Sequence, residues 1–310
     1  MRVLVTGGGG FVGGHLLRLL WEHGHEVSTL GQGAPKLSHR GRHVELDILD
    51  KVAVDDTVAE LGPEAIIHLA ALSNILYCWQ EPEKAVAVNV CGMLHVLEAF
   101  AKVTPGGKFI SIGSSDAYGF AAKSRRPLKE DDVCLPQNPY AISKLCAEQM
   151  ALQLGKRLGL KVIHTRSFNH FGPGQALGFV ISDFASQIAA IESGAKRPVL
   201  SVGDLSASRD FTYVADVVAA YASLLENDVP VGVYNVSSGR ALKIQQVLDS
   251  LLALSKVKVE IEKDNTRMRP SEVPFFVGDS GKLRKATGWK PQVTFTDGLN
   301  ETLAYWRGVK

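Results

Sequence analysis

Two side chains with complementary proton chemistry lie four residues apart near the middle of the 310-residue chain. Tyr140 and Lys144 belong to the stretch Asn138-Pro-Tyr-Ala-Ile-Ser-Lys144, and a helix beginning there places both side chains on one face, one turn apart. A helix N-terminus and an ammonium group both favour the phenolate, so we expect a lowered pKa for Tyr140 and proton exchange near neutral pH. The spacing often arises by chance, and the alternative interpretation is an exposed helix start.

A hydroxyl group that can hold a substrate oxygen comes earlier in the chain. Ser114 follows the apolar run 108–113, which predicts a strand, and Ser115 and Asp116 continue the same loop. With a tyrosine and a lysine downstream, the Ser114 hydroxyl can donate a hydrogen bond to an oxygen that gains charge during a reaction. Ordinary turn chemistry is the other interpretation of adjacent serines.

A glycine-rich turn close to the N-terminus predicts a dinucleotide site. A β-branched run at 2–6, three glycines at intervals of three, and an amphipathic pattern from Leu16 onward occur in the order strand, turn, helix. Glycines permit the tight turn and the close approach of a pyrophosphate to the amides at the helix N-terminus. The residues assigned to this turn are Gly7, Gly10, Phe11, Val12 and Gly13.

The segment after the second expected strand (25–30) indicates which coenzyme is bound. It reads Leu30-Gly-Gln-Gly33, without the acidic residue that would accept a ribose 2′-hydroxyl. Basic residues follow at Lys36, Arg40 and Arg42, and Arg40 is our candidate for a 2′-phosphate contact. We therefore expect NADP(H), with NAD(H) as the alternative cofactor, and a solvated basic loop as the other interpretation.

Strands and helices alternate through the first half of the chain, which predicts an α/β protein with a doubly wound parallel sheet. Further strands are expected at 42–46, 65–70, 108–113 and 161–166, with helices at 50–61, 83–103 and 140–158. Ligands of such sheets bind at the carboxyl ends of the strands. Cofactor-binding candidates at these ends or on the long helix are Asp47, Ile48, Leu69, Ala70, Ala71 and Asn89.

The remainder of the chain predicts a second, smaller α/β lobe. Helices are expected at 179–193, 214–226 and 243–254, and strands at 199–202, 232–236 and 257–261, while the charged segment 123–137 reads as a loop across the mouth of the site. We expect a cofactor domain of residues 1–167 plus about 205–238. A second lobe of about 168–204 plus 239–310, which would bind the substrate, should pack directly on it.

Composition excludes several classes of protein. With 34 basic and 32 acidic residues the net charge is +2, so neither a nucleic-acid partner nor a membrane surface is indicated. The four cysteines lack metal-site spacing, so we expect no metal site and read them as reduced thiols in a cytoplasmic protein. The N-terminus enters a strand pattern directly, which gives no sign of a secretion signal.

Taken together, the glycines, Ser114 and Tyr140-Ala-Ile-Ser-Lys144 resemble the extended short-chain dehydrogenase/reductases that modify nucleotide sugars. The resemblance covers essentially the whole chain. The segments 166–175, 179–185, 209–211 and 269–274 look most like GDP-4-keto-6-deoxy-mannose reductases, with GDP-mannose 4,6-dehydratases as near neighbours.

This resemblance implies roles for individual residues. Tyr140 would be the general acid, Lys144 its tuner and a nicotinamide-ribose contact, and Ser114 the donor to the substrate O4. Asn89 would support the nicotinamide site. The implied substrate-binding residues are Ser115, Asp116, Asn169, Phe179, Val180, Asp183, Arg209, Arg269 and Glu272.

The expected reaction is NADPH-dependent reduction of the C4 ketone of a GDP-linked 4-keto-6-deoxyhexose to a GDP-6-deoxyhexose of the GDP-rhamnose type, with either configuration at C4. The resembling dehydratases have a glutamate where Asp116 stands, and this shorter side chain disfavours removal of the C5 proton. A GDP-mannose 4,6-dehydratase, a UDP-hexose 4-epimerase and a non-catalytic NADP-sensing protein are the alternatives. Resemblance also implies a homodimer formed through helices 83–103 and 140–158, whose apolar residues beyond one stripe include Val88, Met93, Leu145 and Met150.

Overall fold

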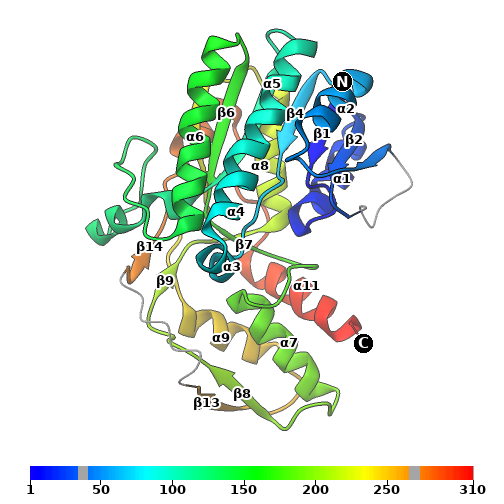
Figure 1. Ribbon diagram of the computed structural model, residues 1–310. Coiled ribbons are helices and arrows are strands. Elements are labelled where there is room, and N and C mark those ends of the chain that lie inside the picture. The colour runs from blue at the N-terminus through cyan, green and yellow to red at the C-terminus, as the bar shows by residue number, and fades with distance from the viewer. Residues whose placement is uncertain (34–40, 265–272, 310) are drawn as a thin grey trace.

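The computed structural model describes residues 1–33, 41–264 and 273–309. Its centre is a seven-stranded, all-parallel sheet in the order β11-β6-β5-β4-β1-β2-β3 (Figure 1). The strands are β1 (Arg2–Thr6), β2 (Glu26–Gly31), β3 (His43–Glu45), β4 (Ala65–His68), β5 (Lys108–Ser114), β6 (Lys161–Ser167) and β11 (Gly232–Val236). The strand order reverses between β1 and β4, as in dinucleotide-binding sheets, which confirms the predicted fold class.

Alternating residues of each strand face opposite helical layers. Val3 and Val5 of β1 join a core with α1 (Phe11–Glu22) and α8 (Val214–Glu226). Leu4 faces the other core, which α2 (Lys51–Leu61), α5 (Met93–Val103) and α6 (Pro139–Arg157) cover. Because both faces are covered, successive residues Val3, Leu4 and Val5 of β1 are all apolar and buried, as expected for a central parallel strand.

The helix expected at 83–103 is confirmed as a continuous helical run, Pro82–Val103, which contains a π-helical turn. The structure has α3 (Ile75–Gln80), which the sequence analysis missed, then α4 (Pro82–Val86), a π-helical turn η1 (Ala87–Gly92) and α5. The run Pro82–Val103 is long and apolar enough to cross a membrane by length and composition, but 44% of its most apolar 18-residue window is buried, and α5 packs between α2 and α6. That packing is typical of a core helix.

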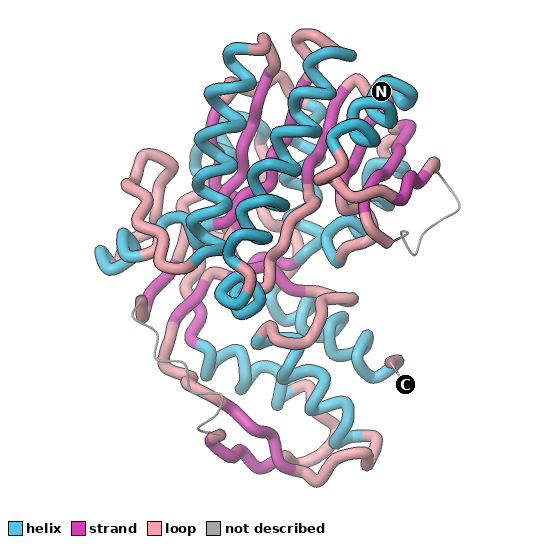
Figure 2. The backbone as a smooth tube through the Cα atoms, in the orientation of Figure 1, coloured by secondary structure: helices cyan, strands magenta, loops and turns pink. Residues whose placement is uncertain are grey.

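The second part of the chain forms smaller sheets and a helical group below the large sheet (Figure 2). Its strands are β7 (Asn169–Phe171), β8 (Val199–Val202), β9 (Ser208–Arg209), β10 (Phe211–Tyr213), β12 (Leu242–Lys243), β13 (Glu260–Lys263) and β14 (Phe275–Phe276). They pair as β10-β7, β12-β9-β14 and β13-β8. The helices α7 (Val180–Glu192), α9 (Ile244–Ala253) and α11 (Phe295–Gly308) pack on one another.

Two helices near the C-terminus were absent from the prediction. α11 begins at Thr294, whose side chain accepts a hydrogen bond from the Asp297 amide, so this N-cap was a usable signal. α10 (Gly281–Thr287) packs on β11 and α8 of the large sheet. The expected boundaries of the two lobes stay a prediction.

Candidate active site

The glycine-rich turn has the geometry that a dinucleotide needs. Gly7 adopts φ +70°, and a Cβ atom there would lie 2.8 Å from the Ala70 amide nitrogen. At Gly13 a Cβ atom would lie 2.5 Å from the Gly8 carbonyl oxygen. Gly10 is the N-cap of α1 and has no side chain. The first amides of the helix, at Phe11, Val12 and Gly13, therefore receive no side-chain cap from it. These residues fit a pyrophosphate at the helix N-terminus.

The other candidate cofactor residues lie at the carboxyl ends of neighbouring strands. The amides of Leu69 and Ala70 bond to the carbonyl and the hydroxyl of Thr6, which places the segment with Ala71 beside the glycine turn. Ile48 is buried against Gly92 of η1, while Asp47 is exposed.

Of the three basic residues expected near a 2′-phosphate, only Arg42 lies in the described part of the chain. Lys36 and Arg40 lie outside the described residues. Arg42 is described, and its guanidinium forms a 2.6 Å ion pair with Glu60. Both partners are about half exposed or more, so this pair contributes little stability. The preference for NADP(H) stays a prediction.

The Tyr140 helix begins as its residues predict. Asn138 accepts a 2.8 Å hydrogen bond from the Ala141 amide, and Pro139 occupies the first helical position. Lys144 is buried one turn after Tyr140, and its ammonium group donates to the Ile112 carbonyl at 2.5 Å. Burial lowers the pKa of Lys144 to about 8.

The expected lowering of the Tyr140 pKa is wrong for the described structure. Burial and the neighbouring Asp116 carboxyl raise the pKa of Tyr140, and a hydrogen bond with Ser114 opposes that rise only in part. Desolvation of the phenolate is the largest cause of this rise. The phenol is protonated at neutral pH, which is the form that a general acid requires.

Asn89 supports this helix from the π-helical turn. Its side chain exchanges two hydrogen bonds with Leu72, accepting from the amide at 2.7 Å and donating to the carbonyl at 3.0 Å. The same amide group donates to the Ser143 hydroxyl at 2.9 Å, and Ser143 donates to the Tyr140 carbonyl at 2.8 Å. Ser143, which the sequence analysis did not single out, thus links η1 to the turn that carries Tyr140. A π-turn at a functional position is a recurrent feature.

A cavity of about 250 Å³ lies in the second part of the chain. Three of the expected substrate residues line it, namely Asn169, Val180 and Arg209. Asp204, Ala207, Phe211 and Ile244 complete its wall; of these four, only Phe211 lies in a segment that the sequence analysis singled out. Arg269 and Glu272 lie outside the described residues.

Asp116 connects this cavity with the catalytic groups. Its carboxyl raises the pKa of Tyr140 and interacts electrostatically with Arg209. Burial lowers the pKa of Arg209, while Asp116 and Asp204 oppose this effect. The Asp116 amide also donates to the Ser114 hydroxyl at 3.1 Å, and Ser115 beside it is buried. Asp116 therefore interacts both with Tyr140 and with Arg209 of the cavity wall, while the joint role of the expected residues stays a prediction.

The start of α7 contains the candidate for base recognition. Phe179 is 46% exposed, and the Asp183 carboxylate accepts a 2.8 Å hydrogen bond from the Gly178 amide. This contact closes the turn before α7, which fits an acid in the first turn of a helix. Recognition of guanine by Asp183 stays a prediction.

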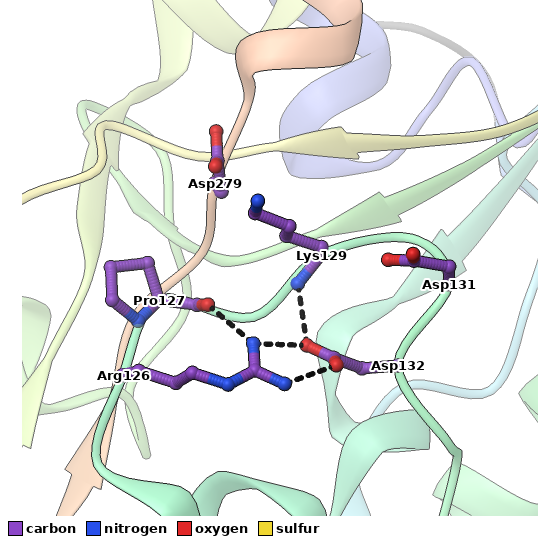
Figure 3. Close-up of a pocket in the computed structure, with 6 residues that line it drawn as sticks. All are labelled: Arg126, Pro127, Lys129, Asp131, Asp132 and Asp279. Carbon is purple, nitrogen blue, oxygen red and sulfur yellow. Dashed lines mark hydrogen bonds and ion pairs between the residues drawn. The ribbon is translucent and has the colours of Figure 1, made fainter.

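A second hollow, of about 370 Å³, lies on the segment 126–132 and contains none of the expected site residues (Figure 3). Within it, Arg126 pairs with Asp132, which also accepts a hydrogen bond from the Lys129 amide (Figure 3). The same segment is fixed to the chain after β14, because Leu128 bonds to Val277 and Asp279. No group of three or more His, Cys, Asp or Glu side chains in the described parts of the chain is arranged to hold a metal ion.

Comparisons with known proteins agree with this geometry. The family described as GDP-mannose 4,6 dehydratase matches residues 4–302. A GDP-6-deoxy-D-mannose reductase of Pseudomonas aeruginosa is 38% identical over 98% of this chain and 97% of its own. The solved structure of RMD from Pseudomonas aeruginosa complexed with NADPH has a TM-score of 0.86 at 36% identity, covering 99% of this chain and 98% of that one.

A more distant neighbour carries out a different reaction on the same fold. The UDP-glucose 4-epimerase of Thermotoga maritima, solved with UDP-glucose, has a TM-score of 0.85 at 27% identity and covers 99% of both chains. The family match extends over nearly the whole chain. It includes the glycine turn and the residues Ser114, Tyr140 and Lys144. The chain belongs to the GDP-mannose 4,6 dehydratase family of extended short-chain dehydrogenase/reductases.

Proposed function

We propose that this protein reduces the C4 ketone of a GDP-linked 4-keto-6-deoxyhexose with NADPH and releases a GDP-6-deoxyhexose. The observation that carries the proposal is the 38% identity, over nearly the full length of both chains, to a GDP-6-deoxy-D-mannose reductase. NADPH is proposed because a neighbour at 36% identity was solved with it. An oxidoreductase also fits the protonated tyrosine beside a buried lysine.

The residues of this chain perform the acid chemistry and the positioning. Ser114 and Tyr140 share a hydrogen bond, and a substrate O4 placed between these hydroxyls would receive a hydrogen bond from each. Tyr140 transfers its proton to O4 as negative charge develops there. Lys144, held by the Ile112 carbonyl, contributes positive charge beside the phenolate that remains. Bound NADPH supplies the hydride that reduces C4.

The substrate diphosphate is assigned to the cavity lined by Arg209 and Asn169. A guanidinium group suits a diphosphate because its donors match phosphate oxygens in pairs. Arg269 and Glu272 are proposed for the diphosphate and the nucleotide ribose.

The test is to mix the protein with NADPH and GDP-4-keto-6-deoxy-mannose and to follow absorbance of the reduced nicotinamide. We expect stoichiometric oxidation of NADPH, and product analysis then assigns the C4 configuration. Formation of the 4-keto-6-deoxy sugar from GDP-mannose with catalytic NADP⁺ would instead identify a dehydratase. Interconversion of UDP-hexoses with catalytic NAD⁺ would identify an epimerase. Tight NADP binding without any turnover would favour the sensor.

A cytoplasmic homodimer completes the proposal. Ile142 and Met150 on α6 and Val86 on α4 are more than 40% exposed, as expected for a helical interface with a second copy. Met93 was expected among the interface residues, but its side chain is only 1% exposed, because it packs in the core between the sheet and the helices α2, α5 and α6. Light scattering at micromolar concentration should give the mass of a dimer, and a monomer alone would contradict it.

A further inference from the structure

Asp210 is a buried carboxylate that the proposed reaction does not use. It is 0% exposed and accepts four hydrogen bonds from neutral donors. One oxygen accepts from the amide and the hydroxyl of Ser238, at 2.8 and 2.6 Å. The other accepts from the amides of Gly239 and Gly278, at 3.0 and 3.2 Å. Two carboxylate oxygens offer about four acceptor positions, so this group is fully satisfied.

The four donors come from different parts of the fold. Ser238 and Gly239 follow β11, the edge strand of the large sheet. Gly278 follows β14, which pairs with β9 in a small sheet of the second part of the chain (Figure 1). Asp210 lies between β9 and β10, and its own amide donates to the Phe276 carbonyl at 3.0 Å. One side chain therefore joins the edge of the cofactor sheet to the sheet that carries Arg209.

Three residues that line the cavity are joined to the backbone of Asp210, two by covalent bonds and one by a hydrogen bond. Its neighbours Arg209 and Phe211 both line the cavity. Its carbonyl accepts a hydrogen bond of 3.4 Å from the side chain of Asn169, a third lining residue. Movement of the backbone at 210 would displace all three lining groups together.

We propose that Asp210 is a positioning residue that fixes Arg209, Phe211 and Asn169 for nucleotide-sugar binding by anchoring the β9–β10 backbone to the turns after β11 and β14. The inference rests on the proposed function only for the identity of the ligand. Asp210 should therefore affect the affinity for the nucleotide diphosphate. It should not affect the affinity for the coenzyme, because the coenzyme turn at Gly7–Gly13 lies between β1 and α1.

Asp210→Asn is the decisive variant, because it keeps the shape but turns one acceptor into a donor facing N–H groups. We expect the Kd for GDP, measured by calorimetry, to rise at least about tenfold and the Kd for NADPH to stay within about twofold. Asp216→Asn is the matched control: Asp216 is also a buried acceptor of two backbone amides, those of Gln292 and Val293. This control should lower the Tm while leaving the Kd for GDP unchanged.

Hydrogen exchange gives a readout that needs no ligand. Exchange of the backbone amides of residues 206–211 should be faster in Asp210→Asn than in the wild type. In Asp216→Asn these amides should exchange as in the wild type, and only amides near residue 292 should exchange faster. Should the wild type fail to bind GDP, the proposed function fails, while the exchange result still decides the role of Asp210. If Asp210→Asn does not fold, Ser238→Ala removes the shortest of the four bonds, with a rise of about threefold expected in the Kd for GDP. Unchanged exchange at 206–211, or equal loss of GDP and NADPH affinity, would overturn the proposal.

Discussion

Asn89 donates a 2.9 Å hydrogen bond to the hydroxyl of Ser143, and so ties the π-helical turn to the first turn of the helix that carries Tyr140. Both side chains are buried, and Ser143 passes the contact on to the Tyr140 carbonyl. The position of the acid thus depends on a contact between two helices.

Asn89→Ala should therefore reduce kcat more than it changes substrate affinity. The substitution removes the hydrogen bonds that Asn89 makes with the part-buried amide and carbonyl of Leu72 and with the buried Ser143 hydroxyl, which costs about 1 to 3 kcal/mol of unfolding free energy. We expect kcat to fall by about tenfold or more, because the tyrosine loses its fixed position. Steady-state kinetics with thermal unfolding measure both effects, and a variant with reduced Tm but wild-type kcat would assign Asn89 to stability alone.

Tyr140→Phe should lower kcat by about 10² to 10⁴, the usual contribution of a positioned acid, with little change in coenzyme affinity. Asp116→Asn should cost far less, because carbonyl reduction needs no base at C5. The same substitution lowers the negative charge beside Tyr140, so the pKa of the tyrosine should fall. Activity on GDP-mannose that disappears in Asp116→Asn would contradict reduction and identify a dehydratase.

Burial of Lys144 should make the free energy of unfolding depend on pH in the alkaline range. Its pKa is lowered by burial from 10.5 to about 8, so between these values the unfolded chain binds more protons than the folded one. Unfolding free energy should then rise with pH across this window, by up to about 3 kcal/mol. Below pH 8 both states carry the charge, and the burial penalty is constant.

Chemical denaturation of wild type and Lys144→Met between pH 7 and about 10.5 isolates this contribution. The difference in unfolding free energy between the two proteins should change in favour of wild type as pH rises. A difference that stays constant would mean that the folded-state pKa is ordinary.

NADPH should bind more tightly than NADH, because no carboxylate follows β2 and basic residues follow it. One charge-assisted contact is worth about 1.5 to 3 kcal/mol. Arg40→Ala should remove most of this preference, whereas Arg42→Ala should leave it, since Arg42 already pairs with Glu60. Calorimetric titration with both coenzymes is the measurement, and equal affinities in the wild type would refute the preference.

Asp183 offers a test of base recognition. Guanine presents two adjacent donors that a carboxylate can accept together, whereas uracil does not, so Asp183→Asn should weaken GDP binding by at least about tenfold and leave UDP binding unchanged. Equal effects on both nucleotides would assign Asp183 a structural role at the start of α7, which includes its contact with the Gly178 amide.

Local sequence was sufficient for the features that depend on neighbouring residues. Strand, glycine turn and helix follow directly at 2–22, because Gly7 must adopt a positive φ and Gly13 has no room for a Cβ atom. The start of α6 follows from Asn138 and Pro139 by capping. The parallel, doubly wound character of the sheet follows from the alternating strand and helix patterns, whereas the order of its strands comes from the structure.

Tertiary structure alone decided the features whose partners are distant in sequence. Asn89 meets Ser143 across 54 residues, and Asp210 meets Gly278 across 68. The π-turn that aims Asn89 has no periodic signal, so the interval 83–103 reads as one helix. The direction of the Tyr140 pKa shift was predicted wrongly from sequence: the helix start and Lys144 are local, whereas the burial and the Asp116 carboxyl that raise the pKa exist only once the chain has folded.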